Sequence, residues 1–177
     1  ERKSSQRLEE LLDAGSYHLL LLQQKIRGEF LGYALVYQAE EVLWLDYLAI
    51  AESSRGLGYG SYFFQQIPLF WEKSIGMFLE IEIPTSQNPI VRRQQEKRIS
   101  FYEGLGAQKL GFPYLFPTEE GGFPMHLYFK PQEDLNLLSR SFIEQALTGV
   151  FENLHKDVGC GRAILKQNLN AAKEHRL

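Results

Sequence analysis

The chain has 177 residues, close to the usual length of one domain, and its hydrophobic fraction of 44% is enough for one sizeable core. The 19 Lys and Arg against 22 Asp and Glu give a formal net charge of −3, which argues against broad nonspecific binding to nucleic acid. No apolar run approaches the roughly 20 residues that span a membrane. The single cysteine, Cys160, excludes an intrachain disulfide and a zinc site built from cysteines.

The amino end and the lone cysteine predict the compartment. The first ten residues, ERKSSQRLEE, are polar and do not resemble a signal peptide. A chain that cannot form an internal disulfide suits a reducing environment. We therefore expect a cytoplasmic protein.

The first half of the chain predicts one short helix and three strands. From apolar spacing and turn residues, these elements are expected over residues 4–14, 17–23, 30–38 and 42–50. The last two strands should form an antiparallel hairpin. The glycine-dense segment ESSRGLGYGS follows and leads into a helix over residues 62–75, which Pro68 should kink or split.

The second half begins with a strictly alternating strand over residues 78–83, in which Glu80 and Glu82 point to the face opposite Leu79. The remaining expected elements are a loop over 84–89, a helix over 94–105, a strand pair over 109–116 and 125–130, and tail helices from Asp134 to Leu154 and over 162–175. The order is that of an α+β (α/β-like) domain with a mixed sheet.

The tail sets the expected domain division. The pattern changes near residue 132, so we expect one domain over residues 1–131 and a C-terminal helical extension over 132–177. The apolar stripe of the extension must be buried, either on its own domain or across a homodimer.

The glycine loop is the clearest candidate for a ligand site. It lies between a strand ending at Ile50 and a helix, and it places backbone N–H groups at a helix amino end, where they suit a pyrophosphate. A dinucleotide fingerprint started at Gly56 fails because Ser61 stands where glycine is needed, and no lysine follows for a GxxxxGK[ST] loop. The template [RQ]xxGx[GA] is met by Arg55, Gly58 and Gly60. A tight turn without a ligand is the alternative.

Three segments resemble the GNAT family of N-acetyltransferases in order and spacing. LDYLAIAESSRGLGYGSYFF resembles the central motif, FLEIEIP the fifth strand, and RRQQEKRISFYEGLGAQKLG the later helix motif with its aromatic–Tyr pair. The last of these, with the following PYLxP and PMxLxxKP patterns, is similar to a bacterial subgroup. The resemblance covers about residues 17–130 and implies a twisted, mostly antiparallel mixed sheet with helices on both faces. It also implies that the first strand and helix of the family precede residue 1. One departure is Ala107, where the family commonly has Phe.

The resemblance implies acetyl transfer from acetyl-CoA to a primary amine by direct attack, with no metal. It implies that Tyr102 is the general acid for the departing thiolate and that the Ile50 N–H polarises the thioester carbonyl. Leu48 and Ala49 would pair with the pantetheine arm, and Arg55 would help to hold the pyrophosphate. The loop backbone that would complete the pyrophosphate site belongs to Gly56, Leu57, Gly58, Tyr59, Gly60 and Ser61.

The general base has two candidates. Asp46 stands in the acidic place of the central motif, and a regular strand would put it on the face of Ile50 unless a bulge intervenes. Glu80 could act together with Glu82, because repulsion and partial burial would raise one pKa toward neutrality. We favour Asp46 and Glu80 jointly, with ion pairing or a solvated edge as the structural alternatives.

Other features leave alternatives open. The four His residues lack the spacing of metal ligands. The basic run formed by Arg92, Arg93, Lys97 and Arg98 is either a solvated helix face or a contact for the 3′-phosphate of the cofactor. The rival to the enzyme is a non-catalytic acyl-CoA-binding module on the same fold, and a protein-interaction domain is a remoter rival.

Overall fold

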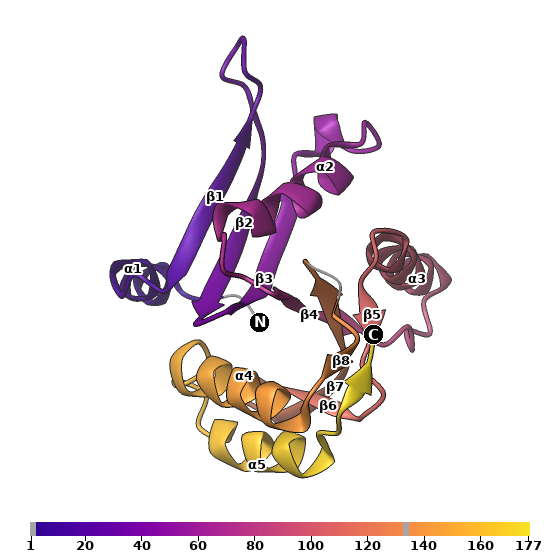
Figure 1. Cartoon of the computed structure of the whole chain (residues 1–177). Helices are drawn as coiled ribbons and strands as arrows, with labels where there is room; N and C mark the ends of the chain where they lie inside the picture. Colours follow the sequence, from indigo (N-terminus) through magenta and orange to yellow (C-terminus); the bar gives the residue numbers. More distant parts are fainter. Residues whose placement is uncertain (1–2, 133–134) are drawn as a thin grey trace.

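The computed structural model describes residues 3–132 and 135–177. Its centre is a seven-stranded sheet with the order β1-β2-β3-β4-β7-β5, and β6 also pairs with β7 (Figure 1). The strands are β1 (Tyr17–Gln23), β2 (Phe30–Ala39), β3 (Val42–Ile50), β4 (Gly76–Glu82), β5 (Gln108–Lys109), β6 (Tyr114–Thr118) and β7 (Gly121–Pro131). Among the strand pairs of the described residues, β3 with β4 is the one parallel pair. The expected mixed, mostly antiparallel α+β architecture is thus confirmed.

Helices cover both faces of this sheet. The elements are α1 (Ser5–Asp13), α2 (Tyr59–Gln66), α3 (Pro89–Gly104), α4 (Arg140–Asn153) and α5 (Gly161–Ala171), with 3₁₀ turns η1 (Glu52–Ser54) and η2 (Ile67–Phe70). Packed side chains place α2 and α3 on one face, and α1, α4 and α5 on the other. We call these the cleft face and the tail face. No helix in the described part of the chain is long and apolar enough to cross a membrane.

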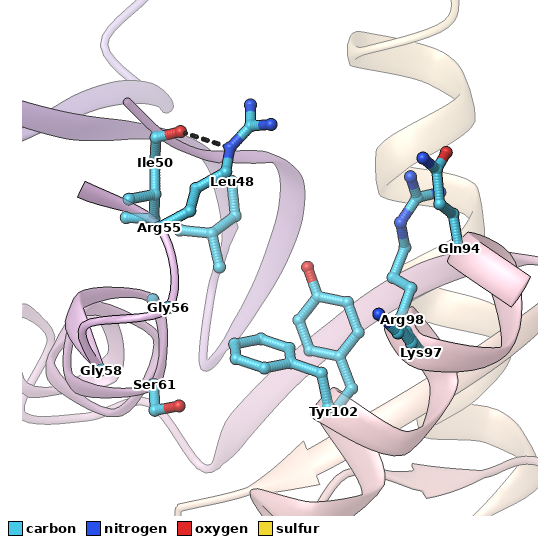
Figure 2. A pocket seen from close by; sticks show the side chains of 12 residues that line it. Leu48, Ile50, Arg55, Gly56, Gly58, Ser61, Gln94, Lys97, Arg98 and Tyr102 are labelled. Atoms are coloured by element: carbon cyan, nitrogen blue, oxygen red, sulfur yellow. Dashed lines mark hydrogen bonds between the residues drawn. The ribbon is translucent and has the colours of Figure 1, made fainter. Parts of the chain in front are cut away.

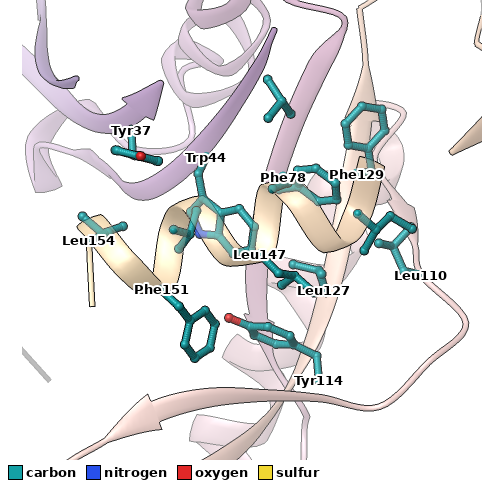
Figure 3. Packing of buried hydrophobic residues seen from close by; sticks show 14 of the residues in the cluster. Tyr37, Trp44, Phe78, Leu110, Tyr114, Leu127, Phe129, Leu147, Phe151 and Leu154 are labelled. Atoms are coloured by element: carbon teal, nitrogen blue, oxygen red, sulfur yellow. The ribbon is translucent and has the colours of Figure 1, made fainter. Parts of the chain in front are cut away.

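The tail face contains the larger core. Trp44 of β3 stacks on Phe78 of β4 with ring centroids 5.4 Å apart, and Leu147 and Phe151 of α4 are buried against the same cluster (Figure 3). The apolar stripe of the first tail helix is therefore buried against the sheet of its own chain. The division at residue 132 stays a prediction.

Two expected helices begin or end at other residues in the structure. Pro68 ends α2 early, because proline cannot continue the helical ladder, and the chain passes into η2. Helix α3 begins at Pro89 instead of residue 94, because the Asn88 side chain caps it by accepting from the Ile90 N–H.

The tail also differs from the expected pair of helices. The start expected at Asp134 lies outside the described residues. Helix α4 begins only at Arg140, and the short strands β8 (Leu137–Leu138) and β9 (His175–Arg176) pair with each other. The pairing joins the two ends of the tail, which local periodicity did not indicate.

Strands β3 and β4 separate partway along their length. Their pairing runs from Val42 opposite Gly76 to Leu45 opposite Leu79, whereas β3 continues to Ile50 and β4 to Glu82. Backbone groups beyond these pairs face an opening in the sheet. This opening positions the site described next.

Candidate functional site

A cleft of about 620 Å³ lies between α2 and α3 on the cleft face (Figure 2). Leu48 and Ile50 from the end of β3 line it together with the glycine loop, and α3 lines the other side. The Tyr102 hydroxyl points into the space between them. The α3 residues at the cleft are Gln94, Lys97, Arg98, Phe101 and Tyr102.

The glycine loop presents backbone donors to this cleft. Gly56 and Gly58 have φ of 76° and 84°, the left-handed region that glycine adopts without a steric cost. Gly58 is the N-cap of α2, and its carbonyl accepts from the Tyr62 N–H at 3.0 Å. The preceding N–H groups, from Tyr59 to Ser61, therefore have no intrahelical acceptor. Together with the helix dipole they suit an anionic ligand.

The backbone of Ile50 is directed toward the opening between β3 and β4. The Ala51 N–H donates to the Leu31 carbonyl of β2 at 2.8 Å. Since successive N–H groups of a strand point to opposite sides, the Ile50 N–H points away from β2. The Arg55 Nε donates to the Ile50 carbonyl at 3.1 Å, which holds the guanidinium beside the end of β3.

Tyr102 lies in an aromatic cluster beside the opening. Its ring centroid is 5.1 Å from that of Phe64 and 5.0 Å from that of Phe101. Burial raises the pKa of Tyr102 to about 12, and the nearby Arg98 charge lowers it. The phenol is therefore protonated at neutral pH and can donate a proton.

The described lining of the cleft contains cations and no carboxylate. Arg55, Lys97 and Arg98 contribute the positive charge. Arg92 instead pairs with Glu96 on the exposed side of α3, at 3.9 Å. Two lining residues, Gln94 and Phe101, were not predicted. Gln94 is three residues before Lys97 and Phe101 is three residues after Arg98, so helical spacing puts them on the same face of α3 as this pair and could have indicated them.

The predicted cofactor residues divide into two sets. Ala49 pairs with Tyr33 on the tail face, Leu57 is exposed, and neither these nor Tyr59 line the cleft. The residues that do line it are Leu48, Ile50, Arg55, Gly56, Gly58, Gly60 and Ser61.

Asp46 lies on the tail face because of a β-bulge. Leu35 pairs with Tyr47 and Val36 pairs with Leu45, so Asp46 is the extra residue of β3. In a regular strand, Asp46 would lie on the same face as Ile50. The bulge turns Asp46 to the opposite face. Its carboxylate accepts from the Tyr17 hydroxyl at 2.5 Å and pairs with the Lys3 Nζ at 2.8 Å.

Glu80 lies close to Asp46 on the same face. It accepts from the Tyr114 hydroxyl, and from the Trp44 Nε1 at 3.3 Å. Burial raises the pKa of Glu80 to about 7, and the charge of Asp46 adds to the rise, while these two hydrogen bonds and the Lys3 charge lower it.

The expected partnership of Glu80 with Glu82 is wrong. Glu82 is at the end of β4, where it accepts from Gln95 at 3.3 Å and pairs with Arg98 of α3 at 3.2 Å. The like charge that acts on Glu80 comes from Asp46. In residues 3–132 and 135–177, no three His, Cys, Asp or Glu side chains gather closely enough to hold a metal ion.

Comparisons with known proteins give a match in structure. No family model matches the sequence, and no curated protein is significantly similar to it. A solved structure described as a GNAT-family acetyltransferase, from Bacteroides thetaiotaomicron, is similar with a TM-score of 0.65 and 21% identity over 88% of this chain and 80% of its own. The chain has the GNAT fold.

Two further solved structures support this assignment. A GNAT-family acetyltransferase from Elizabethkingia anophelis with bound acetyl-CoA has a TM-score of 0.54 and 16% identity, covering 72% of this chain and 83% of its own. Spermidine N-acetyltransferase from Vibrio cholerae, in complex with CoA and spermine, has a TM-score of 0.53 and 13% identity, covering 74% and 77%. The resemblance of the sequence to the GNAT family is therefore confirmed in the fold.

Proposed function

We propose that the protein is an N-acetyltransferase that moves an acetyl group from acetyl-CoA to a primary amine by direct attack. The observation that carries the proposal is the cleft at the opening of β3 and β4. It combines free helix N–H groups, a strand N–H and a protonated tyrosine. GNAT-fold proteins crystallised with CoA or acetyl-CoA support this choice of ligand.

The residues present fit acetyl-CoA, which would supply the acyl group as a thioester. The N–H groups from Tyr59 to Ser61 would bind the pyrophosphate, with Arg55 adding charge. Lys97 and Arg98 would face the remaining phosphate. These donors match a polyanion, and the cleft brings no carboxylate that would repel it.

The reacting groups would meet where the sheet opens. The Ile50 N–H would donate to the thioester oxygen as negative charge develops there. The Tyr102 hydroxyl would give its proton to the sulfur as the C–S bond breaks. Glu80 or Asp46 would take the proton that the attacking ammonium must lose. Asp46 is two residues before Leu48, about 7 Å along the strand, so the carboxylates approach the opening from the tail face.

Thermal unfolding with and without acetyl-CoA tests the proposal, with ATP and NAD as controls. A ligand at about 100 times its Kd adds roughly 2.7 kcal/mol, a Tm rise of about 5 to 10 °C for a chain of this size. Thiol release with a panel of amines, spermine included, then measures turnover. A Tm rise without turnover by any amine would favour the non-catalytic acyl-CoA-binding module. No rise from a folded sample would contradict both.

A further inference from the structure

The carboxylate of Asp46 is already in contact with an amine of this chain. Lys3 comes from the segment before α1, and its Nζ lies 2.8 Å from the Asp46 Oδ2. The same Nζ lies 5.5 Å from the centroid of the Tyr47 ring. The Lys3 and Asp46 side chains are only 11% and 5% exposed. An ammonium on an unbranched four-carbon stem is therefore enclosed on the tail face.

This ion pair differs from the others in the described residues. Each of the other pairs has a partner whose side chain is more than 40% exposed, which is typical of pairs that contribute little. Removing a lysine ammonium from water is costly unless the surroundings replace its hydration. A carboxylate and an aromatic face provide such surroundings for an alkylammonium.

The enclosed ammonium lies beside the two carboxylates that would take the proton in the proposed reaction. Asp46 is on the strand that brings Leu48 and Ile50 to the cleft, and the Lys3 charge also reaches Glu80. A hollow of about 230 Å³ borders Lys3, with Phe116 and Pro117 of β6 among its walls. Glu119, His155 and Asp157 also line this hollow, so it leaves room of mixed polarity for the remainder of a ligand beyond the ammonium.

We propose that Lys3 occupies the acceptor site of the enzyme, so that the site takes a primary ammonium on an unbranched alkyl chain, which must displace Lys3 to bind. This inference rests on the proposed function, because only an N-acetyltransferase would use the bound amine as an acceptor. The binding site itself can be tested without turnover.

The test is chemical rescue of Lys3→Ala with n-butylamine, a primary amine on the same unbranched four-carbon stem as the lysine side chain. At 100 mM amine we expect the Tm of Lys3→Ala to rise by about 3 °C over an equal concentration of NaCl. Wild type should not respond, and tert-butylamine should not replace the linear amine. Lys3→Met retains the stem without the charge, so it should fill the hollow and show no rescue. Lys25→Ala, at an exposed lysine of the β1–β2 turn, is the matched control.

Kinetics connect the site to transfer. Because the tethered ammonium competes with the acceptor, Lys3→Ala should lower the KM for n-butylamine about tenfold relative to wild type, whereas Lys25→Ala should not. A Lys3→Ala protein that is folded and gains no stability from n-butylamine would overturn the proposal, as would an unchanged KM. If rescue occurs but acetyl-CoA gives no Tm rise, the transfer function fails and the alkylammonium site stands.

Discussion

The two faces of the sheet differ in their charged side chains where β3 and β4 separate, although Lys3 pairs with one of the two carboxylates on the tail face. On the cleft face, Arg55, Lys97 and Arg98 border the opening. On the tail face, Asp46 and Glu80 lie beside it. In the proposed reaction, the sheet would keep a polyanionic ligand and a cationic one on different sides, and its opening would allow their reacting ends to meet. The division of charge, more than any single residue, supports transfer between two such ligands.

The largest expected effect comes from a substitution on the cleft face that removes the hydroxyl group of Tyr102. Tyr102→Phe should lower kcat about 1000-fold, because the departing sulfur loses its proton donor. The Kd for acetyl-CoA should stay within about twofold, since the ring packing remains. Steady-state kinetics and calorimetry separate the two effects. Tyr62→Phe, on an exposed tyrosine of α2, is the control, and full activity of Tyr102→Phe would refute the assigned role.

A second change acts on the tail face. Glu80→Gln should lower kcat about 100-fold at pH 8, because the amide cannot accept the proton of the amine. The base must be ionised to act, and the pKa of Glu80 is about 7, so wild-type activity should rise with pH through that value. The neighbours of Glu80 are Tyr114, Trp44, Asp46 and Lys3. A pH–rate profile should lose its limb near pH 7 in the variant. A retained limb would assign it to another group.

A third change tests whether the charges on the two faces act separately. Arg55→Ala should weaken acetyl-CoA binding about tenfold, a loss of about 1.4 kcal/mol, because one charged contact to a phosphate is removed. The KM for the amine should not change, since the amine is bound on the other face. Calorimetric titration measures the first quantity. Arg27→Ala, in the exposed β1–β2 turn, should match wild type in both.

The smallest expected effect is on the pH dependence of the free energy of unfolding, and it comes from a buried histidine on the tail face. His155 is buried between Phe116 and Phe151, and burial lowers its pKa to about 3, helped by the Lys3 and Arg7 charges. Because the unfolded chain binds a proton that the fold does not, the stabilisation present above pH 6.5 is lost as the pH falls toward 3. Wild type should lose about 1 kcal/mol more than His155→Leu between pH 7.5 and 6. Urea unfolding at both pH values measures this, and equal losses would show that His155 titrates normally.

Local signals in the sequence predicted most of the fold. Strands β1 and β3 begin and end where apolar runs and turn residues indicated, and Pro68 ended its helix as proline chemistry requires. The start of α3 was missed although Asn88 and Pro89 form a recognisable helix start. The pairing of β8 with β9 joins residues nearly forty apart, and no local periodicity encodes such a contact.

In the candidate site too, local motifs could be predicted from the sequence, whereas contacts between distant residues could not. The glycine loop and Tyr102 belong to short contiguous motifs, and the structure brings both to one cleft. The surroundings of the carboxylates come from distant segments. Lys3 reaches Asp46 across 43 positions, and Tyr114 reaches Glu80 across 34. The side that Asp46 faces depended on one extra residue in a strand, which only the register with β2 revealed.

The incomplete pairing of β3 with β4 has a consequence for the protein without its ligand. The backbone amides from Leu48 to Ile50 lack a neighbouring strand on one side, so those that point into the opening should exchange quickly with deuterated solvent. An extended ligand arm lying along them would supply the missing neighbour and slow that exchange. Until it does, the exposed backbone resembles the edge of a sheet and can pair with a foreign strand. The ligand-free protein would then be the form most prone to self-association, and bound acetyl-CoA would reduce this tendency by covering the exposed backbone.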